Sequence, residues 1–484
     1  MNYVKKLLKK YNDIPIVAKA TIWFVFCSTL QKCMSLITTP IFTRLMSTEQ
    51  YGQFTVYNSW VQILTIITTF RLNYSVFNKG MSKYKEDRDS YASTMQIVTF
   101  AITAVLFLIY LIFQNFFNNL FELPGFIIMA MFCEMLVFPA VDFWTVRKRY
   151  EYIYRPVVAR TILMVILNAS IGIVAVLMSE EKGYARIMTV IGVNFIFGMS
   201  LFVYNLKKAK KVFVWEYAKF AILFNLPLML HYISQYILDQ FDRIMIQKMI
   251  SMSAAAIYGV AYNAGLIVKT VTNSIGNAIV PWQYDKLEKR EFKKLDDALF
   301  PVFVIVAVLS LVFSAFAPEL IALLADKKYS EAIYVIPPIA MSVFFSFFYS
   351  VFANVEFYYD ENRFTMYISM FGAALNIGLN YIFIDMFGYI AAAYTTLFCY
   401  IIYCLGHYLY MNYSVKKKLK VDRIFEPVRL LVLSAALLLS GLLIIFLYDK
   451  MVIRYILIGI SLIICIWKRK FIIKAIKSVK KSKK

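Results

Sequence analysis

The stretch QYILDQFDRIMIQKMISMSAAAIYGVAYNAG, Gln235 to Gly265, places Asp239, Asp242 and Arg243 close together inside a run of mostly apolar residues. A charge at the centre of a bilayer costs about 2.5–3.5 kcal/mol even on a lenient insertion scale, so such residues usually face a bundle interior or a water-filled path. We therefore expect this stretch to line the interior of a helical bundle.

The composition around this stretch is that of a membrane protein. Of the 484 residues, 61% are hydrophobic and 17% are charged, whereas soluble proteins are about 25% charged. A hydrocarbon core of about 30 Å needs roughly 20 apolar residues per helix. Fourteen spans are expected, covering residues 14–43, 52–77, 91–114, 124–146, 156–178, 187–206, 217–248, 254–282, 297–317, 332–357, 363–385, 388–411, 427–447 and 451–468. These lengths exclude the roughly ten-residue strands of a membrane β-barrel, and we expect an all-α polytopic membrane protein.

The net charge of +23 is distributed in a way that indicates topology. Lys and Arg gather in alternate loops, and the intervening loops hold only Lys182, Arg186, Lys327, Lys328, Lys450 and Arg454. Basic loops stay cytoplasmic, so both termini are expected on the cytoplasmic side and nucleic acid is not the expected partner. The basic, partly apolar ends of the chain suit helices lying on anionic membrane lipids, although fixing the topology is an alternative role for them.

A polar face runs along each of the first two spans. Span 1 carries Lys32 near its middle, where the ammonium cannot easily reach the membrane surface. Span 2 carries Gln62 on its polar face, and Arg71 follows nearer the cytoplasmic end. Long cationic side chains near helix ends often extend to the surface, and this alternative stays open for Arg71.

Spans 7 and 8 repeat this arrangement. Their polar faces comprise Gln235, Asp239, Asp242, Tyr258, Tyr262 and Lys269. A shift of 207 residues aligns Lys32 with Asp239 and Gln62 with Lys269, and twice this period ends near the end of span 12. We therefore expect two parallel six-helix lobes. The expected division is 1–211 for the N-lobe, 212–415 for the C-lobe, and 416–484 for spans 13 and 14 and a basic cytoplasmic tail.

Other charges fall within the expected spans. They are Lys19, Glu134, Asp142, Arg160 and Glu356, of which Glu134 is the deepest. Asp142, Arg160 and Glu356 lie towards the cytoplasmic ends, so we interpret them as helix-end or pairing residues.

Motifs for catalysis, metal binding or nucleotide binding are absent from the sequence. The two histidines, His231 and His407, are far apart, and neither HExxH nor GxxxxGK[ST] occurs. Asp239 and Asp242 have the spacing of an acid/base pair, but charge pairing with the adjacent Arg243 is the stronger interpretation. We expect no catalytic residues, metal or cofactor, and a protein that is not an enzyme.

Two motifs resemble a known family of transporters. TPIFTRLMSTEQYGQFTVYNSW (Thr39–Trp60), DQFDRIMIQKMISMSAAAIYGVAYNAG (Asp239–Gly265) and the fourteen-span layout resemble the polysaccharide repeat-unit flippases of the multidrug/oligosaccharidyl-lipid/polysaccharide exporter (MOP) superfamily. The resemblance implies a MATE-like fold with two lobes, alternating access and a central cationic cavity. It maps that cavity onto Lys32, Arg44, Arg71, Arg243 and Lys269. The two carboxylates beside Arg243 depart from the cationic pattern.

The resemblance also implies the substrate and its route. The substrate would be an oligosaccharide repeat unit linked through pyrophosphate to a polyprenyl lipid, moved across a bacterial plasma membrane for cell-surface polysaccharide biosynthesis. The partners would be a polysaccharide polymerase and glycosyltransferases of the same pathway, and we expect a monomer. Lys32 and Lys269 would attract the pyrophosphate, Arg71 would admit it from the cytoplasmic side, and Asp239, Asp242 and Arg243 would form a charge network.

Two other functions stay open. An ion-coupled exporter of small amphipathic molecules would need an acidic cavity, built around Glu134, Asp142 or Asp239. A membrane enzyme acting on lipid-linked sugars is the other alternative.

Overall fold

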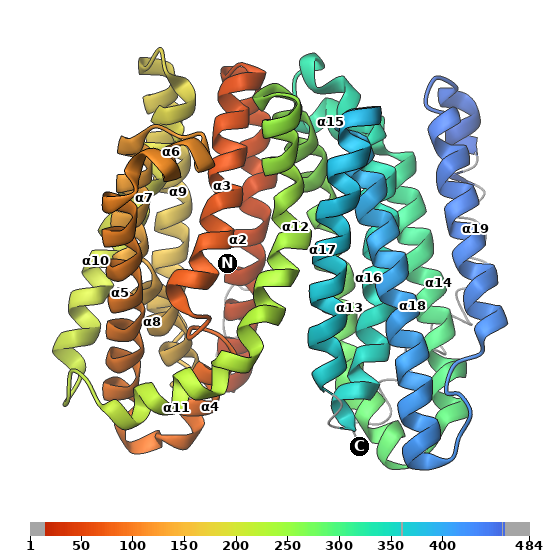
Figure 1. Cartoon of the computed structure of the whole chain (residues 1–484), viewed down its shortest axis with the longest axis horizontal. Helices are drawn as coiled ribbons and strands as arrows, with labels where there is room; N and C mark the ends of the chain where they lie inside the picture. Colours follow the sequence, from red (N-terminus) through yellow and green to blue (C-terminus); the bar gives the residue numbers. More distant parts are fainter. Residues whose placement is uncertain (1–14, 360–361, 457, 460–484) are drawn as a thin grey trace, which may run out of the picture. The chain divides into compact units, whose positions relative to one another are not determined.

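Helices make up all the regular structure in the part of the chain that the computed structural model describes, residues 15–359, 362–456 and 458–459 (Figure 1). The side chains of residues 32, 33, 362 and 363 lie outside this description. Within it, 12 helical stretches are long and apolar enough to cross a membrane. Helices satisfy their own backbone hydrogen bonds, as a segment in lipid must. The predicted all-α membrane fold is confirmed, whereas the count of fourteen spans is not.

Two of the expected spans are not among these helical stretches. The span expected at 52–77 corresponds to α3 (Thr48–Thr69), which is rich in threonine and glutamine. Phe70 and Arg71 follow it with left-handed φ angles of 48° and 54°, a conformation that ends helices. Arg71 therefore lies beyond the helix, and its predicted position within the span was wrong. The span expected at 451–468 runs past the described residues, as do the two basic ends of the chain.

The residues up to Ile233 form the first of two compact units. Helix α10 (Lys182–Lys208) lies at its centre, and its partners are α3, α5 (Arg88–Ile112), α7 (Gly125–Val137), α8 (Pro139–Tyr150) and α9 (Arg155–Met178). The unit also contains α2 (Ile16–Leu45), α4 (Ser75–Lys83), η1 (Lys85–Asp87), α6 (Gln114–Phe121), α11 (Trp215–Asn225) and η2 (Leu226–Leu228).

Close helix packing in this unit depends on a glycine. At Gly198 of α10 a Cβ would lie 2.9 Å from the backbone nitrogen and Cα of Phe138. Pro139 follows at once and separates α7 from α8, within what the sequence suggested as a single span. Small residues allow membrane helices to approach in this way.

The residues from Ser234 onward form the second unit. It holds most of α12 (Met229–Met249) and then α13 (Met252–Glu288), α14 (Phe292–Ala315), α15 (Ala317–Leu324), η3 (Lys327–Tyr334), α16 (Ile336–Tyr358), α17 (Asn362–Phe387), α18 (Ala391–Leu419) and α19 (Pro427–Phe446). The lobe boundaries expected at 211 and 415 stay predictions.

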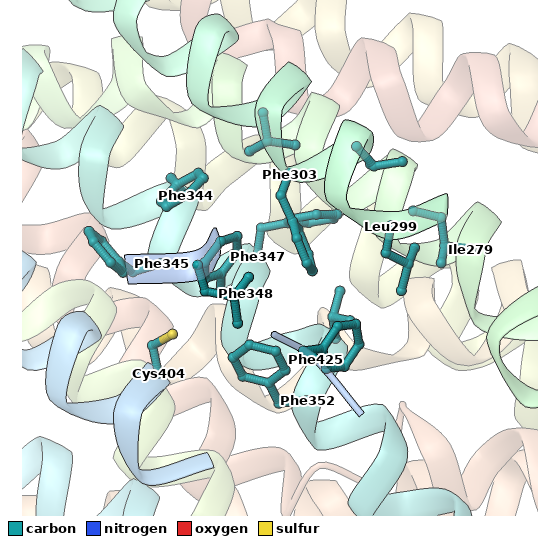
Figure 2. Packing of buried hydrophobic residues seen from close by; sticks show 14 of the residues in the cluster. Ile279, Leu299, Phe303, Phe344, Phe345, Phe347, Phe348, Phe352, Cys404 and Phe425 are labelled. Carbon is teal, nitrogen blue, oxygen red and sulfur yellow. The ribbon is translucent and has the colours of Figure 1, made fainter. Parts of the chain in front are cut away.

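Aromatic packing around α16 builds the core of the second unit. Phe348 stacks at ring-centroid distances of 4.3 Å from Phe344 and 4.4 Å from Phe303 of α14. Figure 2 shows these rings together with Phe352 and Phe425, which lie in the same buried cluster. The core holds α16 against α13, α14, α18 and α19.

A charged turn joins α13 to α14. Glu291 accepts hydrogen bonds from Lys286 and Lys294, each at 2.6 Å. These two ammonium groups lower the pKa of Glu291 to about 2. The carboxylate is therefore ionised at neutral pH and links the end of one helix to the start of the next.

Candidate functional site

Asp239 of α12 forms an ion pair with Lys269 of α13. The lysine Nζ lies 2.7 Å and 2.8 Å from the two carboxylate oxygens. Tyr262 and Tyr400 donate to the same carboxylate at 3.1 Å and 3.2 Å. About a quarter of each charged side chain is exposed, 28% for Asp239 and 25% for Lys269. The pair is therefore neutralised but still accessible.

Asp242, one helical turn further along α12, is fully enclosed. Its carboxylate accepts hydrogen bonds from Tyr258 at 2.6 Å, Asn380 at 2.7 Å and Thr396 at 2.8 Å. These donors come from α13, α17 and α18 respectively. Three donors compensate much of the cost of burying a carboxylate. Asp242 thus ties four helices together.

Arg243 makes no ion pair with Asp239 or Asp242 within the described part of the chain. Its Nη1 donates to the backbone oxygen of Asp239 at 3.1 Å and to Gln240 Oε1 at 2.5 Å. Its guanidinium lies 4.0 Å from the centre of the Tyr262 ring, a cation–π geometry. The predicted pairing of the carboxylates with Arg243 was wrong, because Lys269 and neutral donors on other helices reach them first.

The electrostatics of this cluster are balanced. Two carboxylates, Asp239 and Asp242, face two cations, Arg243 and Lys269. A cavity of about 20 Å³ adjoins the ion pair and is lined by Lys269, Tyr262, Tyr400 and Thr396 among others. This is room for about one water molecule. A group larger than a water molecule fits into this cavity only if side chains around it move.

Sequence reasoning missed the partners that α17 and α18 supply. Asn380 donates to Asn376 at 3.3 Å and accepts from Thr395, while Asn376 donates to Thr396 at 3.3 Å. The asparagines are four residues apart and so share one face of α17. This spacing of two asparagines in an apolar helix was the sequence signal that could have identified them as partners of the buried carboxylate.

The expected site residues of the first unit lie in different surroundings. Glu134 is buried and accepts hydrogen bonds from Tyr57 at 3.0 Å and Asn194 at 2.8 Å. Arg44 donates to the backbone oxygen of Pro40 at 2.7 Å, and Gln62 on α3 is exposed. The side chain of Lys32 lies outside the described residues.

Arg71 packs on two aromatic rings. Its guanidinium lies 4.8 Å from the centre of the Tyr74 ring and 5.5 Å from that of Tyr232. Gln235, expected on the polar face of span 7, is half-buried on α12. Within the second unit the structure thus brings Asp239, Tyr262 and Lys269 into direct contact.

Further charges lie within both units. Asp142 is exposed and accepts from Asn73 at 2.8 Å, and the buried Arg160 donates to the Val141 backbone at 3.1 Å. In the second unit His407 Nδ1 lies 3.0 Å from each carboxylate oxygen of Glu356, and both side chains are fully buried. The described residues contain no cluster of three or more His, Cys, Asp or Glu suited to a metal ion.

Two arginines assigned to loops from the sequence are buried instead. Arg186 lies within α10, 4% exposed, and donates to the Asn168 backbone at 2.8 Å. Arg454 is 3% exposed and pairs with Glu319. The loop assignment was wrong for Arg186 because α10 begins at Lys182, before the apolar run, and for Arg454 because its side chain is buried against Glu319.

Two family models match the chain. The model described as "Polysaccharide biosynthesis protein" matches residues 17–285, and the model described as "MatE" matches residues 227–382. Both matches contain the Asp239–Lys269 pair.

Two curated proteins are related to parts of the chain. The Lsg locus protein 1 of Haemophilus influenzae is 24% identical over 185 residues, 37% of this chain and 46% of that protein. The membrane protein MJ1068 of Methanocaldococcus jannaschii is 26% identical over 210 residues, 42% of this chain and 41% of that protein. The chain therefore spans less than half the length of the curated relatives it matches.

Solved structures with a similar fold are transporters. The lipid II flippase MurJ in an inward closed conformation aligns with a TM-score of 0.68 and 16% identity, covering 94% of this chain and 100% of that one. An inward-facing multidrug resistance MATE family transporter of the MOP superfamily aligns with a TM-score of 0.57 and 14% identity, covering 81% and 96%. At such identities the likeness concerns the fold, and the predicted MATE-like MOP fold is confirmed.

Proposed function

The chain belongs to the polysaccharide biosynthesis protein family, and from that membership we propose that it flips polyprenyl-pyrophosphate-linked oligosaccharide repeat units across a bacterial plasma membrane. The observation that carries this proposal is the family match over residues 17–285. At a coarser level, the chain is a multi-pass membrane protein whose fold neighbours are flippases and transporters rather than enzymes. Both termini would face the cytoplasm.

Lys269 is the residue of the second unit that we assign to the pyrophosphate. Its ammonium is partly exposed but is held by Asp239 at 2.7 Å. A pyrophosphate that binds Lys269 must therefore displace this carboxylate. A low local dielectric strengthens the contact of Lys269 with Asp239 and its contact with pyrophosphate alike. The carboxylate and the pyrophosphate therefore compete for the same ammonium group.

This competition supplies a way to couple substrate binding to a change of state. A ligand shifts a conformational equilibrium only by its differential affinity for the states. Releasing Asp239 from Lys269 removes the ion pair between α12 and α13, while Asp242 still holds α12 through Tyr258. Substrate would thus favour a state in which α12 and α13 are less tightly joined. Lys32 and Arg71 would contact the same anion at other stages.

Transport in vesicles tests the function. Purified protein is reconstituted with a lipid-linked oligosaccharide, and the outward movement of the sugar is followed by its access to a membrane-impermeant glycosidase. We expect protein-dependent exposure of an intact oligosaccharide. We expect Lys32→Ala combined with Lys269→Ala to abolish it, whereas Lys248→Met, at an exposed lysine on α12, should not. Unchanged transport in the double variant would refute the cationic site.

One observation favours a second candidate. The MatE model matches residues 227–382, which include Asp239 and Asp242. An ion-coupled exporter of small amphipathic cations would use such carboxylates. Efflux of cationic dyes from cells that express the chain, abolished by Asp239→Asn, would support this function over lipid flipping.

A further inference from the structure

A cavity of about 220 Å³ lies in the second unit between α14, α19 and two later residues, Arg454 and Ile458. Its walls are apolar side chains such as Val308 and Leu311 of α14 and Leu443 and Ile444 of α19. Among the described residues, the polar side chains that line it are Ser440 and Arg454. It is separate from the Asp239–Lys269 pair, because the two cavities share no lining residue.

Arg454 brings an incompletely satisfied cation to this apolar space. The residue is 3% exposed, and its Nη2 pairs with Glu319 of α15. Its Nε and Nη1 have no hydrogen-bond partner within the described ranges. Buried polar groups are normally satisfied, and a guanidinium presents several N–H groups in a fixed plane that suits phosphate oxygens. The N–H groups on Nε and Nη1 are therefore available to donate hydrogen bonds to an anionic acceptor.

The surroundings of the cavity fit the hydrocarbon part of a lipid. On α19, Leu439 is 69% exposed, Leu443 57% and Phe446 78%. In a membrane-crossing helix such residues face acyl chains. Leu443 also lines the cavity, so the cavity is continuous with this exposed apolar face.

We propose that this cavity binds one bilayer phospholipid, with a phosphodiester oxygen accepting from Arg454 Nε and Nη1 and an acyl chain between α14 and α19. Arg454 then bridges Glu319 and the phosphate. The lipid would hold Arg454 beside α14 and α15. This site is distinct from the one assigned to the transported substrate.

Native mass spectrometry of the delipidated full-length protein tests the proposal. Phosphatidylglycerol is added back, with diacylglycerol of the same chains as the head-group control and glycerol phosphate as the chain control. Loss of a charged hydrogen bond corresponds to about tenfold or more in affinity. We expect one tightly retained phosphatidylglycerol and at least tenfold weaker retention of diacylglycerol. Glycerol phosphate should not compete.

Four variants separate the lipid site from a simple ion pair. Arg454→Gln should weaken phosphatidylglycerol retention about tenfold, whereas Glu319→Gln should keep or strengthen it because the guanidinium loses a competing carboxylate. Ser440→Phe should block the cavity and weaken retention. Ser434→Phe is its matched control on the same helix, at a residue that does not line the cavity.

Several results would overturn the proposal. Equal retention of diacylglycerol and phosphatidylglycerol by the wild-type protein would remove the role of the phosphate. Equal losses in Arg454→Gln and Glu319→Gln would mean that the ion pair serves the fold alone. Displacement of the bound phospholipid by one equivalent of lipid-linked oligosaccharide would assign the cavity to the transported substrate instead. If Arg454→Gln does not fold, the head-group comparison and Glu319→Gln still decide.

Discussion

Replacing Lys269 by methionine removes the ammonium that Asp239 holds at 2.7 Å and 2.8 Å. At this separation the Coulomb attraction is roughly 6 kcal/mol at an effective dielectric constant of about 20, and desolvation offsets a large part of it. Breaking a fully buried pair costs about 3–5 kcal/mol. Because about a quarter of each side chain is exposed, we expect a smaller cost of about 2–3 kcal/mol for Lys269→Met and for Asp239→Asn.

The double variant gives the sharper measurement. With both charges gone, neither is left unpaired, so Asp239→Asn with Lys269→Met should cost about 2 kcal/mol in total. The coupling energy between the two sites would then be about 3 kcal/mol. The free energy of unfolding of the four proteins is measured by denaturant titration in mixed micelles. Lys248→Met, at an exposed position on α12, serves as the control and should change it by less than about 0.5 kcal/mol.

Additive single effects would refute this reasoning. If the double variant loses the sum of the two single losses within about 0.5 kcal/mol, Asp239 and Lys269 do not interact in the folded protein. A Lys269→Met protein as stable as the wild type would also mean that Asp239 and Lys269 do not interact in the folded protein. The measurement concerns stability, so it stays informative whatever the transported substrate is.

Other positions give simpler tests. Gly198→Ala should destabilise the protein by about 1–3 kcal/mol, because the new Cβ meets the Phe138 backbone at 2.9 Å. Gly192→Ala in the same helix meets nothing within 4 Å and should be neutral or slightly stabilising; equal thermal shifts would contradict this. Glu134→Gln should cost about 1–3 kcal/mol by thermal unfolding, since one amide oxygen cannot serve both donors. Glu291→Gln should lower the melting temperature at neutral pH but not near pH 2. The pKa of Glu291 is about 2 in the folded protein and about 4.3 in the unfolded chain, so its ionised carboxylate stabilises the fold above about pH 4.3 and this stabilisation is lost as the pH falls through about 2. A difference in melting temperature between variant and wild type that does not change with pH would contradict this prediction.

The cationic cavity expected from the sequence stays a proposal. Arg71 lies beyond α3 and packs on Tyr74, and Lys269 is neutralised by Asp239. The positions of both side chains depend on contacts that the spacing of residues along one helix does not predict. Arg71 is placed by a left-handed backbone turn, and Lys269 by a carboxylate from another helix.

Composition and periodicity were sufficient for the class of fold. Long apolar runs predict membrane helices because only internally hydrogen-bonded segments are stable in lipid. The same cost of exposing charge to lipid predicts that Asp239, Asp242 and Arg243 point into a bundle. In the structure Asp242 and Arg243 are buried, at 1% and 5% exposure. Which residues share one face of a helix depends only on their spacing along the chain, so the sequence alone determines it.

The tertiary structure alone decided which groups pair. The carboxylate of Asp239 bonds to Lys269, 30 residues on, rather than to the arginine four residues away. Asp242 reaches Asn380 and Thr396, 138 and 154 residues away. Arg454, expected in a loop, proved to be a buried cation beside a cavity. Periodicity gives the direction in which a side chain leaves its own helix, whereas the partner depends on which helices pack together and at what height. That choice arises from the summed packing of the whole unit, and no segment of the sequence specifies it alone.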